Sequence, residues 1–185
     1  MGPMEVAGLL TALAGLAFFV YFFFGSFAYG AGYEPTSARV ADRMIRLANP
    51  SATDLVIDLG AGTGELALRV ARDRGSRVRA VEIDRLRAVI LSLRQRWGND
   101  RDRVTIVRGN LFDEDLTRAN VVFAFLWPAT MARLRPKLER ELRPGTRFVT
   151  HYHPIPGWVP YATSGPVYAY RAPECWASGA TRGGT

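Results

Sequence analysis

Apolar and polar residues follow two different patterns along this chain. From Val6 to Phe24 nineteen residues carry no charge and would be apolar around a whole helix, whereas from residue 38 onward short apolar runs alternate with amphipathic ones. At 1.5 Å per residue, such a helix spans about 28 Å, close to the ~30 Å hydrocarbon core of a bilayer. The pattern predicts a transmembrane helix at residues 6–29, after a flank of residues 1–5.

A cleaved signal peptide is the main alternative for this segment, since Ala28 and Gly30 fit a small-residue cleavage site. The length of the run, and the lack of Lys or Arg before it, disfavour that interpretation. A buried hairpin or an interfacial helix is a further alternative. Because Arg39, Arg43 and Arg46 follow the span, the positive-inside rule puts the C-terminal part on the cytoplasmic side.

The remainder of the chain alternates strand-like and helix-like segments. We expect helices at 38–48, 65–74, 85–97 and 129–142, and strands at 55–59, 78–83, 104–108, 121–126, 148–153, 158–161 and 167–171. Pro136 should break the last helix or start a new one. Near-continuous apolar strands separated by helices predict a buried, mostly parallel α/β sheet over residues 38–171. Residues 30–37 are expected to form a linker and active-site entrance, and residues 172–185 a disordered tail.

Composition and charge add little to this picture. The 185 residues carry a formal charge of +7, and 23 of the 24 basic residues are arginine, interleaved with acids throughout the domain. A GC-rich genome accounts for this, and a basic domain beside an anionic leaflet would also gain about 1 kcal/mol per arginine near the surface. We expect no nucleic-acid partner. The single Cys175 excludes a disulfide framework within one chain.

A glycine-rich loop, D-L-G-A-G-T-G, joins the first strand to the following helix at residues 58–64. Ligands of α/β sheets bind at this carboxyl end of the strands. A dinucleotide fingerprint would need a glycine where Glu65 stands, and no G-K-[ST] of a triphosphate loop is present. What remains is the S-adenosylmethionine (SAM) loop of class I methyltransferases. It assigns cofactor binding to four residues, Asp58, Gly60, Gly62 and Gly64.

Two further positions support a SAM site. Glu82 ends the second strand, where an acid can accept hydrogen bonds from ribose hydroxyls. Asn110 and Leu111 follow the third strand, where this fold usually contacts the adenine amino group and packs an apolar side chain on the ring. The combination predicts a Rossmann-like class I SAM-dependent methyltransferase with a minimal core, and disfavours a dehydrogenase.

The fourth strand ends in F-L-W-P at residues 125–128, which is neither the D/N-P-P-Y motif of amino-purine and glutamine methyltransferases nor a cysteine site. No general base is evident. Methyl transfer to an amine needs an aligned, neutral nucleophile, and an aromatic slot favours the neutral amine by desolvation. Tyr33, Phe125 and Trp127 are therefore our candidate catalytic residues, with a core role as the alternative for the latter two.

Two histidines, His151 and His153, share one face of the fifth strand because they are two residues apart. No cluster of further ligands stands beside them, so we expect no metal site. An ordinary strand-end histidine is the preferred interpretation, with a place for His151 near the substrate amine as the alternative.

The run from Tyr33 to Arg171 resembles archaeal broad-specificity protein-lysine methyltransferases and their membrane-anchored mitochondrial relatives. The shared motifs are Y-E-P-T at 33–36, D-L-G-A-G-T-G at 58–64, V-E-I-D at 81–84, R-G-N-L-F at 108–112, R-P-K-L-E-R-E-L-R-P-G-T-R-F-V at 135–149 and G-W-V-P at 157–160. The Y-x-P-T, P-K-L-E-x-E-L and G-W-x-P stretches are the most specific. One departure is Thr63, where these relatives usually carry Asp, and this puts in doubt how the methionine end of SAM is held.

The resemblance implies lysine methylation with SAM, and an N-terminal segment over the active site. Its mitochondrial members methylate the ATP synthase c-subunit and the adenine nucleotide translocase, so in a eukaryote it implies a mitochondrial membrane. We place four residues at the substrate entrance: Pro35, Thr36, His151 and Trp158.

The predicted protein is a single-pass membrane enzyme that methylates lysine on a membrane-associated protein. Methylation of a lipid amine or small molecule, and SAM binding without catalysis, are the alternatives. Lys137, the sole lysine, is the only internal residue available for self-methylation.

Overall fold

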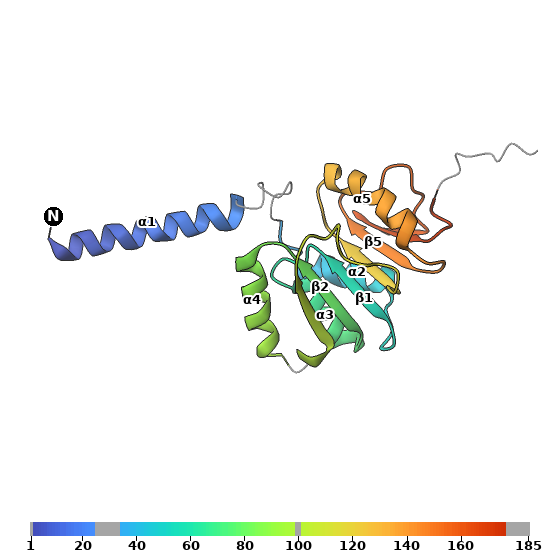
Figure 1. The fold of residues 1–185 in the computed structure, drawn as a ribbon, viewed down its shortest axis with the longest axis horizontal. Helices are drawn as coiled ribbons and strands as arrows, with labels where there is room; N and C mark the ends of the chain where they lie inside the picture. The colour runs from blue at the N-terminus through green and yellow to red at the C-terminus, as the bar shows by residue number, and fades with distance from the viewer. Residues whose placement is uncertain (1, 25–33, 99–100, 177–185) are drawn as a thin grey trace, which may run out of the picture. The chain divides into compact units, whose positions relative to one another are not determined.

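The computed structural model describes residues 2–24, 34–98 and 101–176, and gives no side-chain surroundings for residues 22–24. It divides into two units, Met1–Glu34 and Pro35–Thr185. The first contains helix α1, Pro3–Phe24 (Figure 1). Within it, Pro3–Tyr21 is long and apolar enough to cross a membrane, judged by length and composition. The helix begins before the expected residue 6, and residues 25–29 of the predicted span lie outside the described residues.

The second unit is built on one seven-stranded sheet with the order β3-β2-β1-β4-β5-β7-β6. The strands are β1 (Leu55–Leu59), β2 (Arg77–Glu82), β3 (Val104–Arg108), β4 (Val121–Ala124), β5 (Arg147–His151), β6 (Ala162–Ser164) and β7 (Val167–Arg171). The first five pair in parallel, and β7 pairs antiparallel with both β5 and β6. The predicted, mostly parallel α/β sheet is therefore confirmed.

The described part of this unit contains four α-helices: α2 (Ala38–Ala48) precedes β1, α3 (Glu65–Arg74) follows β1, α4 (Arg85–Arg96) follows β2 and α5 (Pro128–Glu141) follows β4. Side chains of α2, α3 and α4 join one hydrophobic cluster, whereas α5 joins a second cluster on the other face of the sheet. Strand β4 shows the division, since Val121 and Phe123 lie in the first cluster and Val122 and Ala124 in the second. Alternate residues of a strand point to opposite faces, so a buried strand contributes to both cores.

Helix α2 begins at the cap residue Ser37 and ends at Asn49, whose φ of 43° is left-handed. Arg147, the first residue of β5, donates hydrogen bonds to the carbonyl oxygens of Ala48 (2.7 Å) and Asn49 (2.8 Å). This fixes the end of α2 at the edge of the sheet where the parallel strands begin. The start of the helix, with Thr36 before it, consequently lies toward the carboxyl edge.

Helix α5 differs from the prediction at Pro136. The helix continues through the proline instead of breaking there. Met131 and Leu134 before it, and Leu138 after it, all bury in the same cluster, and Pro136 itself is exposed. Burial on both sides of the proline offsets the lost backbone hydrogen bond, which costs about 3 kcal/mol in a helix interior.

Several strand predictions also differ from the structure. Strand β2 is shifted by one residue from the expected 78–83, and β4 ends at Ala124 rather than at residue 126. Strand β5 ends at His151 rather than at residue 153, because Tyr152 adopts a left-handed φ of 65° and the His153 N–H donates back to the His151 carbonyl (2.8 Å). Residues 158–161 form no strand. The Trp158 N–H instead closes a turn on Ile155 (3.2 Å), and the strand of this region is β6.

Residues 172–176, the first part of the predicted disordered tail, are ordered in the structure. Ala172 accepts a hydrogen bond from the Gly145 N–H (2.7 Å), and Cys175 is only 2% exposed. Burial raises the pKa of the Cys175 thiol to about 12. Ala172 and Cys175 belong to the second core cluster and Trp176 packs against it, whereas residues 177–185 lie outside the described part of the chain.

Gly64 and Gly145 permit a matched test of how tightly the glycine loop packs. Both have a left-handed φ (87° and 88°), but an added Cβ would lie 2.0 Å from Leu91 Cδ1 at Gly64 and within 4 Å of nothing at Gly145. We expect Gly64→Ala to lower the free energy of unfolding by about 2–4 kcal/mol and Gly145→Ala by about 1–2 kcal/mol. Urea unfolding in detergent, followed by circular dichroism, measures both. Equal losses would contradict this packing.

Candidate functional site

The glycine loop is fixed to the neighbouring strand β2. The N–H groups of Gly60 and Ala61 both donate to the Val81 carbonyl (2.9 Å each). Gly60, Gly62 and Gly64 have φ values of 82°, 58° and 87°, a region that residues with a Cβ enter at a cost of about 1–2 kcal/mol. The loop therefore turns tightly across the carboxyl ends of β1 and β2, with its backbone open to close approach by a ligand.

Glu82 lies directly beneath this loop and is 5% exposed. Its Oε2 accepts from the Gly62 N–H (2.7 Å), and its Oε1 accepts from the Asp84 N–H (2.8 Å). Burial raises the pKa of Glu82, although the two backbone hydrogen bonds oppose the shift. Each carboxylate oxygen has two lone pairs, so Glu82 can hold the loop and also accept ligand hydroxyls.

Asp58, the last polar residue of β1, is also buried, and burial together with the charge of Glu82 raises its pKa to about 7. Its Oδ2 atom has no hydrogen-bond partner among the described residues. An orphaned buried acceptor is costly unless a ligand or water donates to it. The position at the end of β1 is one where a bound cofactor meets the sheet.

The end of β3 completes this edge of the site. The Gly109 N–H donates to the Glu82 carbonyl (3.1 Å), which holds the segment beside the acid. Asn110 Oδ1 accepts from the Phe112 N–H (3.1 Å), while Leu111 is half-buried against the second core cluster. The structure thus brings all seven predicted cofactor residues to the carboxyl edge of β1, β2 and β3. The orphaned Asp58 oxygen, the open glycine backbone and the Glu82 carboxylate fit SAM.

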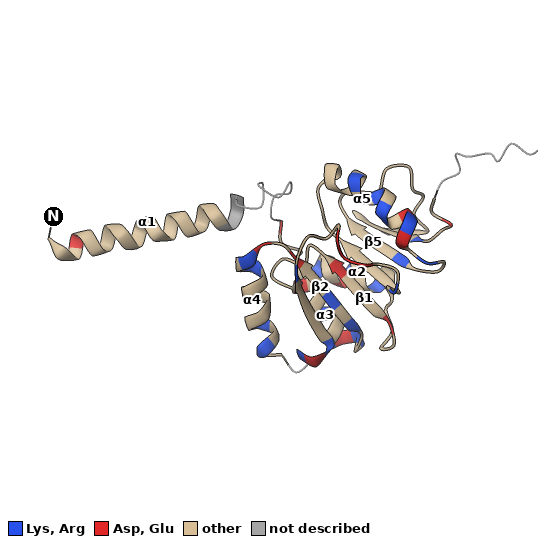
Figure 2. Cartoon of the chain, in the orientation of Figure 1, with Lys and Arg blue, Asp and Glu red and all other residues tan. Residues whose placement is uncertain are grey.

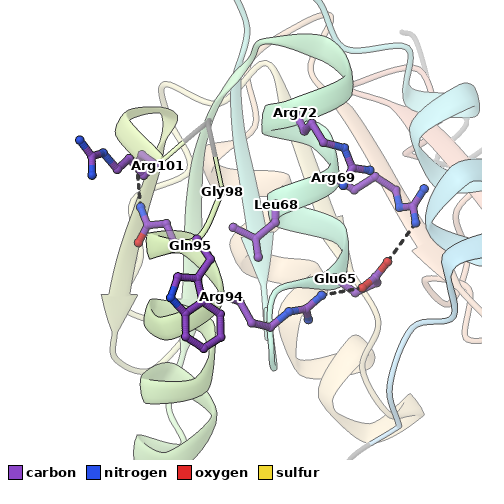
Figure 3. Close-up of a pocket in the computed structure, with 9 residues that line it drawn as sticks. Glu65, Leu68, Arg69, Arg72, Arg94, Gln95, Gly98 and Arg101 are labelled. Carbon is purple, nitrogen blue, oxygen red and sulfur yellow. Dashed lines mark hydrogen bonds and ion pairs between the residues drawn. The ribbon is translucent and has the colours of Figure 1, made fainter.

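A chain of ion pairs supports the glycine loop from the side of the helices. Arg94 of α4 donates to the Thr63 carbonyl (2.8 Å) and pairs with Glu65 (2.9 Å), which also binds Arg69 (3.1 Å). Arg69 continues to Asp42 of α2 (3.0 Å). Figure 3 shows Glu65 between the two arginines. The role of Arg94 could not be predicted from the sequence, because nothing in the spacing indicates that α4 reaches back to residue 63.

These arginines line a cleft of about 440 Å³ between α3 and α4. Its lining residues are Glu65, Leu68, Arg69, Arg72, Arg94, Gln95, Trp97, Gly98 and Arg101. The cleft does not include the predicted cofactor residues. The cleft lies between α3 and α4 and not at the carboxyl edge of the sheet, where the predicted cofactor residues lie.

Two of the three predicted catalytic aromatics, Phe125 and Trp127, lie where β4 ends next to the loop. An added Cβ on Gly60 would lie 3.0 Å from Leu126 Cδ2, so the segment after β4 contacts the glycine loop. Phe125 is half-buried, with its ring centroid 4.5 Å from that of the buried His151. Trp127, the cap residue of α5, is 43% exposed. Phe125 and His151 therefore form one aromatic pair across the ends of β4 and β5.

The other predicted catalytic and entrance residues lie in different places. Pro35 is exposed and Thr36 half-buried just before α2, whereas Tyr33 lies outside the described residues. Trp158 is not at an entrance. It is 6% exposed within the second core cluster, and its Nε1 donates to Glu139 (3.0 Å). An indole buries well when its N–H finds such an acceptor, which explains the position.

Lys137 is poorly placed for self-methylation. It is 7% exposed, and its Nζ forms an ion pair with Glu141 (2.7 Å) one turn along α5. The same Glu141 carboxylate accepts from the Leu116 N–H (3.3 Å). The lysine thus stabilises α5 and the loop before β4.

Comparisons with known proteins agree with this geometry. Residues 58–162 match the family described as the ANTKMT methyltransferase domain. A protein-lysine N-methyltransferase from Saccharolobus islandicus is 39% identical over 131 residues, which cover 69% of this chain and 80% of that protein. A ribosomal protein L11 methyltransferase from Geobacillus thermodenitrificans is 29% identical over 123 residues, 66% of this chain but 39% of that protein.

A solved structure provides the comparison for the fold and cofactor. An RNA methyltransferase from Salinibacter ruber, in complex with S-adenosyl-L-homocysteine, superposes with a TM-score of 0.73 at 34% identity. The match covers 76% of this chain and 95% of that one. It confirms the class I methyltransferase fold predicted here, and the bound S-adenosyl-L-homocysteine, which SAM becomes after losing its methyl group, supports SAM as the cofactor.

Loss of either buried acid should weaken cofactor binding. We expect Glu82→Ala and Asp58→Ala each to raise the Kd for SAM more than tenfold, since each removes a carboxylate from the edge that carries the cofactor residues. Titration calorimetry on the full chain in detergent measures the change. Asp102→Ala, an exposed carboxylate just before β3, is the control and should keep the original Kd. Unchanged affinity in both acid variants would show that the site is misplaced.

Asp58 should also make the stability of the SAM-free protein depend on pH. Between its ordinary pKa of 3.8 and about 7, the unfolded chain has lost the Asp58 proton while the folded protein keeps it. The free energy of unfolding therefore falls as pH rises through this window.

Asp58→Asn lacks this titration. Its free energy of unfolding, relative to the native chain, should rise by up to about 1.4 kcal/mol per pH unit between roughly pH 4 and 7, and stay level above. Urea unfolding at stepped pH tests this, with Asp102→Asn as the control. Parallel curves for Asp58→Asn and the native chain would contradict the raised pKa.

Proposed function

Because this chain belongs to the ANTKMT methyltransferase domain family and has the fold of SAM-dependent methyltransferases, we propose that it methylates lysine on a membrane-associated protein. The observation that carries the proposal is the Saccharolobus islandicus relative, a protein-lysine N-methyltransferase 39% identical over 80% of its length. At this level of similarity the two chains share most of the domain and not only a cofactor loop.

The site chemistry supports an amine acceptor. SAM, when bound, supplies an electrophilic methyl group on a sulfonium. A lysine amine, with an ordinary pKa of about 10.4, must lose its proton before it can attack. The half-buried Phe125 beside His151, together with the exposed Trp127, offers an aromatic environment that favours the neutral amine by desolvation. These residues position and desolvate the nucleophile, and in-line alignment of the amine with the methyl group lowers the barrier further.

The membrane part of the proposal rests on α1 and its flanks. Helix α1 is apolar on all sides, and its side chains from Val6 to Tyr21 are exposed. No charged residue lies between Glu5 and Glu34, and Arg39, Arg43 and Arg46 follow. We therefore propose a single-pass protein with its catalytic unit on the cytoplasmic side. A tether of this kind restricts the enzyme to the membrane surface and raises its effective concentration for membrane targets.

RNA methylation is the second candidate. The structure from Salinibacter ruber is that of an RNA methyltransferase, at 34% identity, and this chain carries a charge of +7. The protein-lysine relative is more similar in sequence, and it favours the first candidate. Both candidates use the same SAM site, so only the methylated product separates them.

Isotope-labelled SAM can identify that product. The full chain is incubated with labelled SAM and the membrane fraction of cells that lack it, and the protein, lipid and RNA pools are separated and hydrolysed. We expect label in methyl-lysine of membrane proteins, and none with Glu82→Ala at the same SAM concentration. Label in RNA would favour the second candidate, and label in lipid would indicate a lipid amine. Measurable SAM binding without any product would indicate a binding protein without catalysis.

A further inference from the structure

Helix α4 has an apolar face that no element of the described catalytic unit covers. Leu86, Val89, Ile90, Leu93 and Trp97 follow one another at helical spacing and share one side of the helix. Val89, Leu93 and Trp97 are 49%, 44% and 85% exposed. Ala88 and Leu91, on the other side, are buried toward the sheet. The helix therefore has an apolar stripe that is exposed at Val89, Leu93 and Trp97 and half-buried at Leu86 and Ile90. We call these five residues the α4 stripe.

The charges of α4 are all positive. Residues 85–96 contain four arginines and neither Asp nor Glu. Figure 2 shows basic residues at both ends of the helix and none of the acidic colour along it. Helical spacing puts the exposed Arg85 and Arg96 along one margin of the α4 stripe and Arg94 along the other. Long arginine side chains can lie along apolar surface while their charges reach water or phosphate.

Two arginines, Arg94 of α4 and Arg69 of α3, already bind groups within the protein and are therefore left out of the proposed lipid contacts. Arg94 is held by Thr63 and Glu65, and Arg69 by Glu65 and Asp42. The outward basic groups are Arg85 and Arg96, with Arg101 at the mouth of the cleft between α3 and α4 (Figure 3).

An apolar stripe with arginines at its margins and a tryptophan at its end is the composition of helices that lie in the interface of an anionic bilayer. A protein partner of opposite charge would also fit the arginines. The candidate membrane span in the same chain decides between the two, because it keeps the catalytic unit close to lipid and so favours weak surface binding. Each arginine near an anionic surface adds about 1 kcal/mol.

We propose that the α4 stripe docks on the surface of an anionic membrane, with Leu93 and Trp97 entering the headgroup region and Arg85 and Arg96 binding lipid phosphates. The proposal rests on the membrane anchoring proposed above. Because α4 also holds the glycine loop through Arg94, docking would set the orientation of the SAM site relative to the membrane.

Fluorescence of Trp97 in vesicles tests this. The full chain and its Trp97→Phe variant are reconstituted in vesicles with brominated acyl chains, either phosphatidylglycerol with phosphatidylcholine or phosphatidylcholine alone. Subtracting the two emission spectra isolates Trp97 from the other tryptophans. We expect at least twofold quenching of Trp97 in the anionic vesicles and less than half of that quenching in the neutral ones.

A matched pair of double variants tests the arginines. Arg85→Gln with Arg96→Gln should lose at least half of the quenching in anionic vesicles. Arg118→Gln with Arg143→Gln removes the same charge from exposed positions elsewhere and should keep the quenching of the native chain. Equal effects of the two pairs would overturn the proposal. So would an unquenched Trp97 in anionic vesicles.

Two further measurements distinguish membrane docking of the α4 stripe from self-association of the chain and from a failure of the membrane anchor. Acrylamide, a quencher dissolved in the water, measures how far Trp97 is shielded. If this shielding increases with the protein-to-lipid ratio, the α4 stripe binds a second copy of the chain, and membrane docking is overturned. Extraction of the vesicles with alkaline carbonate reports the anchor independently. If the chain stays in the vesicles after extraction but Trp97 is not quenched, only the α4 proposal is overturned. If the extraction releases the chain, the membrane anchoring itself is overturned.

Discussion

The hydrogen bond from the Gly62 N–H to the buried carboxylate of Glu82 is the contact on which the rest of the site depends. It joins the glycine loop after β1 to the end of β2, and the Gly109 N–H adds the end of β3 through the Glu82 carbonyl. A buried carboxylate is stable only when hydrogen bonds compensate for lost water. The acid is thereby held in place before any ligand arrives, next to Asp58, whose Oδ2 has no donor among the residues that the structure describes.

The sheet and its helices hold the carboxyl edge of β1, β2 and β3 in position. Core clusters on both faces fix β1, β2 and β4 in register, and the ion-pair chain from Asp42 to Arg94 ties α2, α3 and α4 to Thr63 of the loop. Thr63 needs no carboxylate of its own for this contact, because Arg94 binds its backbone carbonyl. Threonine at position 63 thus leaves the loop supported.

The same helix α4 connects the chemistry to the proposed surroundings of the enzyme. Its inner side chains bury against the sheet, its Arg94 supports the loop, and its outer stripe stays uncovered within the described catalytic unit. A membrane contact through this helix would orient the site toward substrates that the tether alone only keeps nearby. The proposed lysine methylation at a membrane rests on one chain that combines an apolar helix, a cofactor edge and a basic amphipathic face.

Local chemistry in the sequence determined the order of strands and helices, the glycine loop, Glu82 and Asn110, because glycine spacing and apolar periodicity are short-range signals. The apolar N-terminal segment is equally plain in the sequence, although its membrane span stays a prediction. Tertiary packing decided the rest. Burial on both sides of Pro136 kept α5 continuous, and Trp158 went to the core because Glu139 accepts its indole N–H. Helix α4 has apolar residues on more than one side, so only its contacts with the sheet determine which of them remain exposed.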